Sequence, residues 1–100
     1  MIYHVTTKDA WEKASAAGEY IADTIATEGF MHASYAHQLK GVLERYYQGK
    51  KDLILLHIDE SKLLSPLKIE LAPSVNEDFP HVYGPVNINA VTHAEEIPNA

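Results

Sequence analysis

The chain of 100 residues contains no cysteine. This absence excludes a disulfide framework, a thiolate metal site and a cysteine nucleophile, and it gives no reason to expect an oxidising compartment. Arginine occurs only once, as Arg45, and the formal net charge is -6. A balance this acidic argues against the broad basic surface that nucleic-acid-binding proteins use. We therefore expect no nucleic-acid partner.

Long hydrophobic runs are missing as well. The longest, 53–56, is far too short to cross a bilayer, and the start of the chain lacks a basic segment followed by an apolar one. These patterns predict a cytoplasmic protein without a membrane partner. The sequence also has no His-Glu-x-x-His motif, no serine in a nucleophile elbow and no glycine-rich phosphate loop. The reaction classes that depend on those motifs are disfavoured.

What is present is a composition of 46% hydrophobic and 22% charged residues, which is typical of a globular protein. A chain of this length can bury one core but not two, so residues 1–100 are expected to form a single domain.

The segment 29–47 is the most informative stretch. Side chains alternate along a strand, so Phe30, His32 and Ser34 should share one face. Ser34 is a good N-cap, and apolar residues recur from position 39 to position 47 at helical spacing. The pattern predicts a strand that runs directly into a helix over 35–47.

The remaining elements follow from local patterns. Thr7 should cap a first helix that ends at Gly18, and 18–28 should form a connection with one helical turn near 24–27. The other expected segments are strands at 2–6, 53–59, 67–71, 81–83 and 86–91, a turn at 59–64, a surface loop at 72–80 and a fraying tail after position 93. The run 53–59 should be the middle of the sheet because it is continuously apolar. Together these indicate an α+β fold with a mixed, mostly antiparallel sheet of about five or six strands and two main helices.

Three predicted strands carry a histidine and a hydroxyl separated by one residue. If these faces converge beside Phe30 and Phe79, they form a polar cluster suited to a small ligand. Imidazoles in such a cluster can orient a sugar hydroxyl, transfer protons or bind a metal. The three pairs are His4 with Thr6, His32 with Ser34, and His81 with Tyr83.

Two carboxylates, Glu70 and Glu77, are available to act as a base or to orient an imidazole. The alternative for each of these acids is a solvated surface position. Strand alternation alone could also have placed the histidines, each of which would then be hydrogen-bonded to the backbone. We take His37, His57 and His93 to be structural or solvated.

Four blocks of the sequence, 2–6, 28–34, 52–59 and 79–85, occur in the order found in a small uncharacterised bacterial family, the domain of unknown function DUF952, and the chain resembles this family over nearly its whole length. In outline the family is similar to the ADP-ribosyltransferase-like superfamily. That resemblance implies a split sheet around a cleft for NAD.

In that superfamily, a first-strand histidine holds a ribose hydroxyl, and His4 falls at its position. The second element supplies a tyrosine or a Ser-Thr-Ser element beside the nicotinamide, and His32 falls there. The late element supplies a glutamate or a substitute, and His81 and Tyr83 fall near it. The chain departs from the pattern at Val5, where many transferases have a glycine, and in having no clear glutamate at the third position.

The leading hypothesis is a small-molecule-binding domain that binds NAD or another nucleotide and transfers or hydrolyses a ribosyl group. The expected catalytic residues are His4, His32, His81 and Glu77, and the expected ligand-binding residues are Thr6, Phe30, Ser34, Phe79 and Tyr83. A second hypothesis is a metal-dependent hydrolase with His4, His32 and His81 as ligands. A third is a non-catalytic binding module with structural histidines. None of the three predicts an oligomeric state.

Overall fold

A computed structural model describes residues 1–98. In chain order, its helices and strands are β1 (Ile2–Thr7), α1 (Lys8–Ala17), β2 (Glu19–Tyr20), α2 (Thr24–Glu28), β3 (Met31–His32), α3 (Leu39–Tyr46), β4 (Leu53–Ile58), β5 (Leu67–Ala72), β6 (Glu77–Val82), β7 (Val86–Asn87) and β8 (Val91–Ile97). Three short 3-10 turns lie at Ala36–Gln38, Glu60–Lys62 and Ile88–Ala90.

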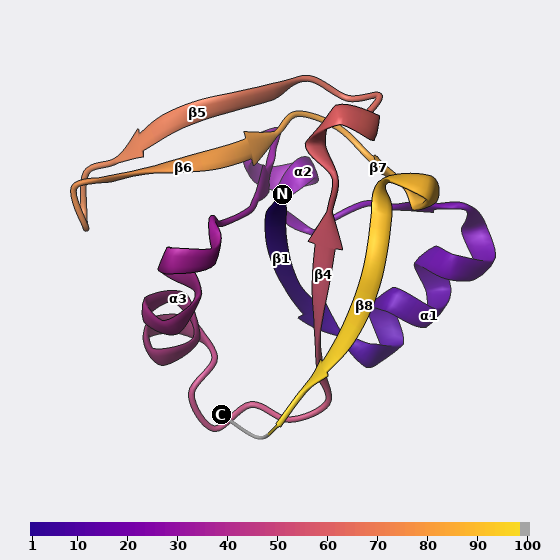
Figure 1. The fold of residues 1–100 in the computed structure, drawn as a ribbon, viewed down its shortest axis with the longest axis horizontal. Coiled ribbons are helices and arrows are strands. Elements are labelled where there is room, and N and C mark those ends of the chain that lie inside the picture. Colours follow the sequence, from indigo (N-terminus) through magenta and orange to yellow (C-terminus); the bar gives the residue numbers. More distant parts are fainter. Residues whose placement is uncertain (99–100) are drawn as a thin grey trace.

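The strands form three small sheets with the orders β1-β4-β8, β2-β7 and β3-β6-β5. Every strand pair within residues 1–98 is antiparallel, so the expected parallel component is wrong, whereas an α+β domain with antiparallel sheets and few helices is confirmed. In Figure 1 the sheet β1-β4-β8 stands in the centre, the β5-β6 hairpin arches over one end, and α1 and α3 lie on either side. An isolated bridge between Tyr3 and Ser34 joins the first strand to the segment after β3.

Strand β4 lies between β1 and β8, as its apolar sequence predicted. Alternate residues of β4, together with Ile2 of β1, point into the core, where Leu56 and Ile58 are fully buried. Full burial of an aliphatic side chain of this size contributes about 1.5–3 kcal/mol. Trp11 and Ala14 of α1 pack against the same core. The opposite face of the sheet carries the half-buried Tyr3 and His57 together with the buried Val5 and Leu53.

Helix α1 begins and ends where the sequence predicted. The Thr7 side chain accepts a hydrogen bond of 3.1 Å from the Ala10 amide, which satisfies one of the free donors of the first turn. Gly18 ends the helix with φ +89°, a conformation that costs glycine little because it has no Cβ. The helical turn expected near 24–27 is α2, but the short strand β2 before it was not predicted.

The expected direct passage from strand to helix after Ser34 is wrong. The strand β3 covers only Met31–His32, and Tyr35, not Ser34, caps the following 3-10 turn through a reciprocal pair with Gln38. Ser34 is buried and its backbone is engaged with Tyr3. Helix α3 therefore begins only at Leu39.

Two expectations in the second half of the chain are also wrong. The loop predicted at 72–80 is a tight β5-β6 turn followed by most of β6, and Asn76 at φ +53° allows this turn. Pro80 lies within β6, but β3 pairs with β6 only at His81 and Val82. The N–H that proline lacks therefore has no partner strand on that side, and its absence destabilises the sheet little. The last strand is 91–97, not 86–91, and it pairs with β4 to Ile97. The tail expected to fray after position 93 is thus ordered to Ile97, and positions 99 and 100 lie outside the described residues.

Within residues 1–98, no helix is long and apolar enough to cross a membrane.

Candidate functional site

Side chains from four segments meet around Phe30. Glu28 ends α2, His32 lies on β3, Glu70 and Lys68 lie on β5, and His81 and Tyr83 lie on or directly after β6. Register explains the meeting, because His32 pairs with His81 and His81 pairs with Lys68, and cross-strand partners share a face. We call this set the Phe30 cluster: Glu28, Phe30, His32, Lys68, Glu70, His81 and Tyr83.

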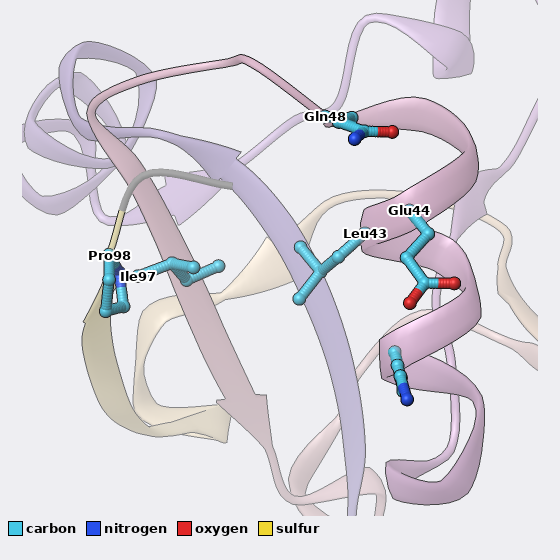
Figure 2. A pocket seen from close by; sticks show the side chains of 6 residues that line it. Leu43, Glu44, Gln48, Ile97 and Pro98 are labelled. Atoms are coloured by element: carbon cyan, nitrogen blue, oxygen red, sulfur yellow. The ribbon is translucent and has the colours of Figure 1, made fainter.

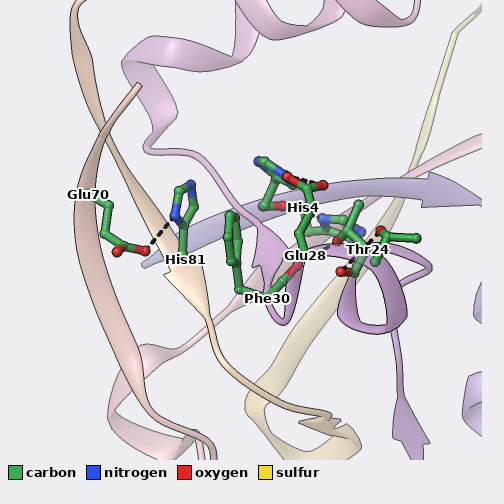
Figure 3. Close-up of polar contacts among 8 residues, drawn as sticks. His4, Thr24, Glu28, Phe30, Glu70 and His81 are labelled. Carbon is green, nitrogen blue, oxygen red and sulfur yellow. Dashed lines mark hydrogen bonds and ion pairs between the residues drawn. The ribbon is translucent and has the colours of Figure 1, made fainter. Parts of the chain in front are cut away.

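Phe30 occupies the centre because the chain reverses just before it. Gly29 ends α2 at φ +87°, a left-handed conformation in which glycine avoids a steric penalty. The Thr24 hydroxyl then donates a hydrogen bond of 2.6 Å to the Phe30 carbonyl oxygen. Figure 3 shows the Phe30 ring beside His81. The two rings are stacked, with centroids 4.1 Å apart and planes 20° apart. The Phe30 ring also lies 4.9 Å from the His32 ring and 5.2 Å from the Tyr83 ring.

Glu70 orients His81 from the neighbouring strand. His81 Nδ1 lies 2.8 Å from Glu70 Oε1 (Figure 3), and the Tyr83 hydroxyl donates to the same oxygen at 2.5 Å. The hydrogen bond from Tyr83, followed by that from His81, holds the Glu70 pKa below its ordinary value. The same contact with Glu70 raises the Tyr83 pKa. Because the ionised carboxylate can only accept, it fixes a proton on Nδ1 of His81.

The second ring nitrogen of His81, Nε2, is left with a free lone pair when the imidazole is neutral. No hydrogen bond to it is found among residues 1–98, and no buried side-chain nitrogen or oxygen there lacks a partner. Nε2 must therefore touch solvent, although the His81 residue as a whole is only 7% exposed. This combination of an oriented ring and an open nitrogen is what a general base requires.

His32 forms a second, more open histidine and carboxylate pair. Its Nε2 lies 3.1 Å and 3.2 Å from the two oxygens of Glu28, and the side chains are 52% and 45% exposed. The rings of His32 and His81 meet edge to face, with centroids 5.2 Å apart. Two carboxylate-oriented imidazoles thus lie side by side, and the Phe30 ring packs against both of them. Lys68 adds a positive charge 4.7 Å from the centre of the Tyr83 ring.

His4 reaches this region only through the backbone. Its Nδ1 lies 2.6 Å from the His32 carbonyl oxygen, and its Nε2 lies 3.0 Å from the Tyr20 hydroxyl, which also hydrogen-bonds Thr6 at 2.9 Å. Burial is the main cause that lowers the His4 pKa to about 4. The neutral ring then carries its proton on Nδ1, which donates to the His32 carbonyl oxygen, and its Nε2 is held against the Tyr20 hydroxyl. Both ring nitrogens are used inside the protein, so His4 positions β3 and has no free atom for a ligand.

The other expected site residues are not in the Phe30 cluster. Thr6 and Ser34 are 7% and 6% exposed, and Thr6 is part of the His4 network. Glu77 begins β6 and accepts from Gln38 at 3.3 Å, so Glu70 rather than Glu77 is the carboxylate on His81. Phe79 pairs with Glu70 in register and flanks the cluster.

The predicted three-histidine metal site is not supported. His4, His32 and His81 do not bring three ring nitrogens together at a ligand spacing in the described part of the chain. The reason is that the ring nitrogens of His4 face the His32 carbonyl and Tyr20, on the inner side of β1.

Two surface hollows lie away from the cluster. One lies between α3 and the end of β8 (Figure 2), lined by Lys40, Leu43, Glu44, Gln48, Ile97 and Pro98. The other adjoins it and is lined by Lys8, Asp52, Leu53, Ile54, Glu96, Ile97 and Pro98. Neither contains a residue of the Phe30 cluster, which forms an aromatic and charged surface beside the β5-β6 hairpin.

Sequence reasoning missed Glu28 and Tyr20 as partners of the histidines. Glu28 could have been found, since it lies four residues before His32 across the turn at Gly29. Tyr20 lies in a stretch without a periodic pattern, and only the pairing of β2 with β7 brings it to His4.

Comparison with known proteins agrees with the architecture. The chain superposes on the crystal structure of protein CC0527 from Caulobacter crescentus with a TM-score of 0.88 and 26% identity, covering 97% of this chain and 85% of that one. The solution NMR structure of CC0527 gives a TM-score of 0.82 and 27% identity, covering 96% and 83%. No curated protein matches the sequence. The model of the family described as "Protein of unknown function (DUF952)" matches residues 5–94, and the chain belongs to this family.

Proposed function

We propose that this protein is a small-molecule-binding domain whose Phe30 cluster takes a ligand with a ring and hydroxyl groups, and that His81 and His32 exchange protons with it. One observation carries the proposal: two carboxylate-oriented imidazoles flank an aromatic ring. Oriented histidines of this kind commonly serve in acid–base chemistry.

His81 is the base in this proposal. Glu70 holds the proton on Nδ1, which leaves Nε2 to accept a proton from a ligand hydroxyl or from an attacking water molecule. Its carboxylate would also stabilise the imidazolium that results. Glu70 stays ionised for this role because Tyr83 and His81 keep its pKa low.

His32 is the acid. In its protonated form it is paired with Glu28 and exposed to solvent, so a proton delivered to a leaving group can be replaced from water. Because the two rings lie 5.2 Å apart, one small ligand can reach both.

The charge of the cluster selects the part of the ligand that binds. The carboxylates of Glu28 and Glu70 outnumber the single lysine, Lys68, so the cluster has a net negative charge when its imidazoles are neutral, which disfavours phosphate and favours hydroxyls or a cationic ring. The nicotinamide riboside end of NAD⁺ has both features, and NAD is also the ligand that the resemblance to ADP-ribosyltransferases implies. In hydrolysis, water would attack the ribose, the bond to nicotinamide would break, and His81 would take the water proton. Nicotinamide leaves NAD⁺ as a neutral molecule and needs no proton, so with this ligand His32 would hydrogen-bond the ribose or the nicotinamide, and its acid role would apply to a leaving group that departs as an anion.

The test is a titration of NAD⁺ into ¹⁵N-labelled protein, up to millimolar concentration, followed by chromatography for released nicotinamide. We expect saturable chemical-shift changes at Phe30, His32 and His81. Phe30→Ala should weaken binding at least about tenfold, since loss of one aromatic contact costs about 1–3 kcal/mol. The matched control is His37→Gln, an exposed histidine outside the cluster.

Binding without nicotinamide release would leave a binding module and remove the ribosyl reaction. No shift change and no thermal stabilisation at millimolar NAD⁺ would remove NAD. The cytoplasmic location expected from the sequence stays a prediction.

A further inference from the structure

The outer face of the sheet β1-β4-β8 carries a second histidine cluster, separate from the Phe30 cluster. His57 on β4 pairs directly with His93 on β8, and Glu95 follows two residues later on the same strand. Residues two apart on a strand share a face, and so do cross-strand partners. The three side chains therefore project from one face, opposite to the face that carries His4.

These side chains already lie at a spacing close to that of metal ligands. One nitrogen of each histidine and one Glu95 oxygen lie within 4.8 Å of one another. His57 Nε2 is 2.8 Å from Glu95 Oε1, and the two imidazole rings are 5.0 Å apart. Ligand atoms around tetrahedral zinc are about 3.3 Å apart, as bond lengths near 2.0–2.1 Å require. Small side-chain rotations would bring the three donor atoms from their present separations of up to 4.8 Å to this spacing.

The strands also fix the positions of these residues. The register shifts between His57 and Ile58 because β8 has an extra residue, Thr92, whose hydroxyl donates to the His57 carbonyl oxygen at 3.3 Å. Such bulges redirect the side chains beside them. Tyr3 packs edge-on against the His57 ring at 5.0 Å, which restricts its rotation. His57 is half-buried, whereas His93 and Glu95 are exposed, so an ion has access from solvent.

We infer that His57, His93 and Glu95 form a binding site for a zinc-like divalent cation. Two imidazoles and one carboxylate are a donor set that zinc uses, and three protein ligands leave a fourth position for water or for a donor atom of a bound molecule. Zinc binds imidazole and carboxylate in their unprotonated forms, so protons compete with the metal and the affinity falls as the pH falls.

The experiment is calorimetric titration of ZnCl₂ into untagged, chelator-treated protein, with the visible absorption of bound Co²⁺ as a second readout. We expect one zinc ion per chain and the bands of a tetrahedral cobalt complex. His93→Gln and Glu95→Gln should each weaken zinc binding at least about tenfold, since even changes to residues behind the ligands cost 10–100-fold. Both residues are exposed, so the variants should fold, which their ¹⁵N spectra will verify.

Two controls separate this site from the other histidines. His37→Gln removes an exposed histidine that stacks on Tyr35, outside both histidine clusters, and His32→Gln removes the most open histidine of the Phe30 cluster; neither should alter zinc affinity. The inference is overturned if no saturable 1:1 binding occurs, or if His93→Gln and Glu95→Gln leave the affinity unchanged. The His57–Glu95 contact is then a surface ion pair only.

Discussion

His4 and His81 share one sequence pattern, a histidine followed two residues later by a hydroxyl on a strand, yet they have opposite surroundings. Both nitrogens of His4 are used by the His32 carbonyl and Tyr20. His81 is engaged only on Nδ1, by Glu70. The difference arises from the neighbours of each side chain. His4 points from β1 toward the core, where the His32 carbonyl and Tyr20 lie, whereas His81 points from β6 toward Glu70 on β5. A repeated motif thus places a histidine, but its neighbours decide whether a nitrogen remains for chemistry.

The largest expected effect tests whether His4 is structural. His4→Ala leaves the His32 carbonyl oxygen without its side-chain partner and leaves the Tyr20 hydroxyl with Thr6 as its remaining partner. An unsatisfied polar group costs about 1–3 kcal/mol, so we expect a loss of about 2–3 kcal/mol in the free energy of unfolding, measured with urea.

His32→Ala is the matched comparison, because its side chain is 52% exposed. Its cost should stay below about 1 kcal/mol, as for most surface substitutions. Equal losses for the two variants would contradict the division between a structural and an available histidine.

The second effect is a pH dependence that belongs to His4. Its pKa is about 4 in the folded protein, against 6.5 as the ordinary value, so the unfolded chain binds more protons between these values. The contribution of the neutral ring is complete above pH 6.5 and is lost as the pH falls through 4. From pH 7 to pH 5 we expect a loss of about 2 kcal/mol from this residue.

The measurement is urea unfolding of the wild type and His4→Gln at both pH values. The variant should lose most of the pH dependence in this interval. A slope that stays unchanged in His4→Gln would assign the effect to other groups.

The smallest expected effect is a change in the pKa of Glu70, the carboxylate that contacts His81. Tyr83→Phe removes the hydrogen bond that lowers the Glu70 pKa most, so that pKa should rise while the fold stays intact. ¹³C NMR titration of the Glu70 carboxyl reports the change directly, and Tyr46→Phe, an exposed tyrosine on α3, is the control. An unmoved Glu70 pKa would mean that Tyr83 does not support the His81 pair.

The elements predicted well are those that carry their own signals. Helix α1 has a cap at each end, and β4 is continuously apolar and central. Strand β8 escaped prediction because His93, Glu95 and Glu96 make its sequence polar. The strand forms because β4 offers it a partner. Similarly, Pro80 suggested a loop, although β6 tolerates it beside the short β3.

The site could likewise be predicted where it depends on neighbouring residues in the sequence, and could not be predicted where it depends on the pairing of distant strands. Strand alternation predicted that Phe30 and His32 share one face, and their rings are in contact. The rings of His81 and Tyr83, which were expected to share a face of their own strand, also contact Phe30. The sequence did not indicate that Glu70, rather than Glu77, contacts His81, because that contact depends on the β5-β6 register, which pairs Lys68 with His81. Register between distant strands is a property of the folded chain that no local pattern encodes.

The row His32, His81 and Lys68 crosses three strands, β3, β6 and β5, one residue from each. A molecule that binds all three side chains would contact segments that are far apart in the sequence. Because it would bind only when the three strands are paired, its binding free energy would stabilise the pairing. Amide hydrogen exchange should then slow across the whole of that small sheet, well beyond the atoms that the molecule touches.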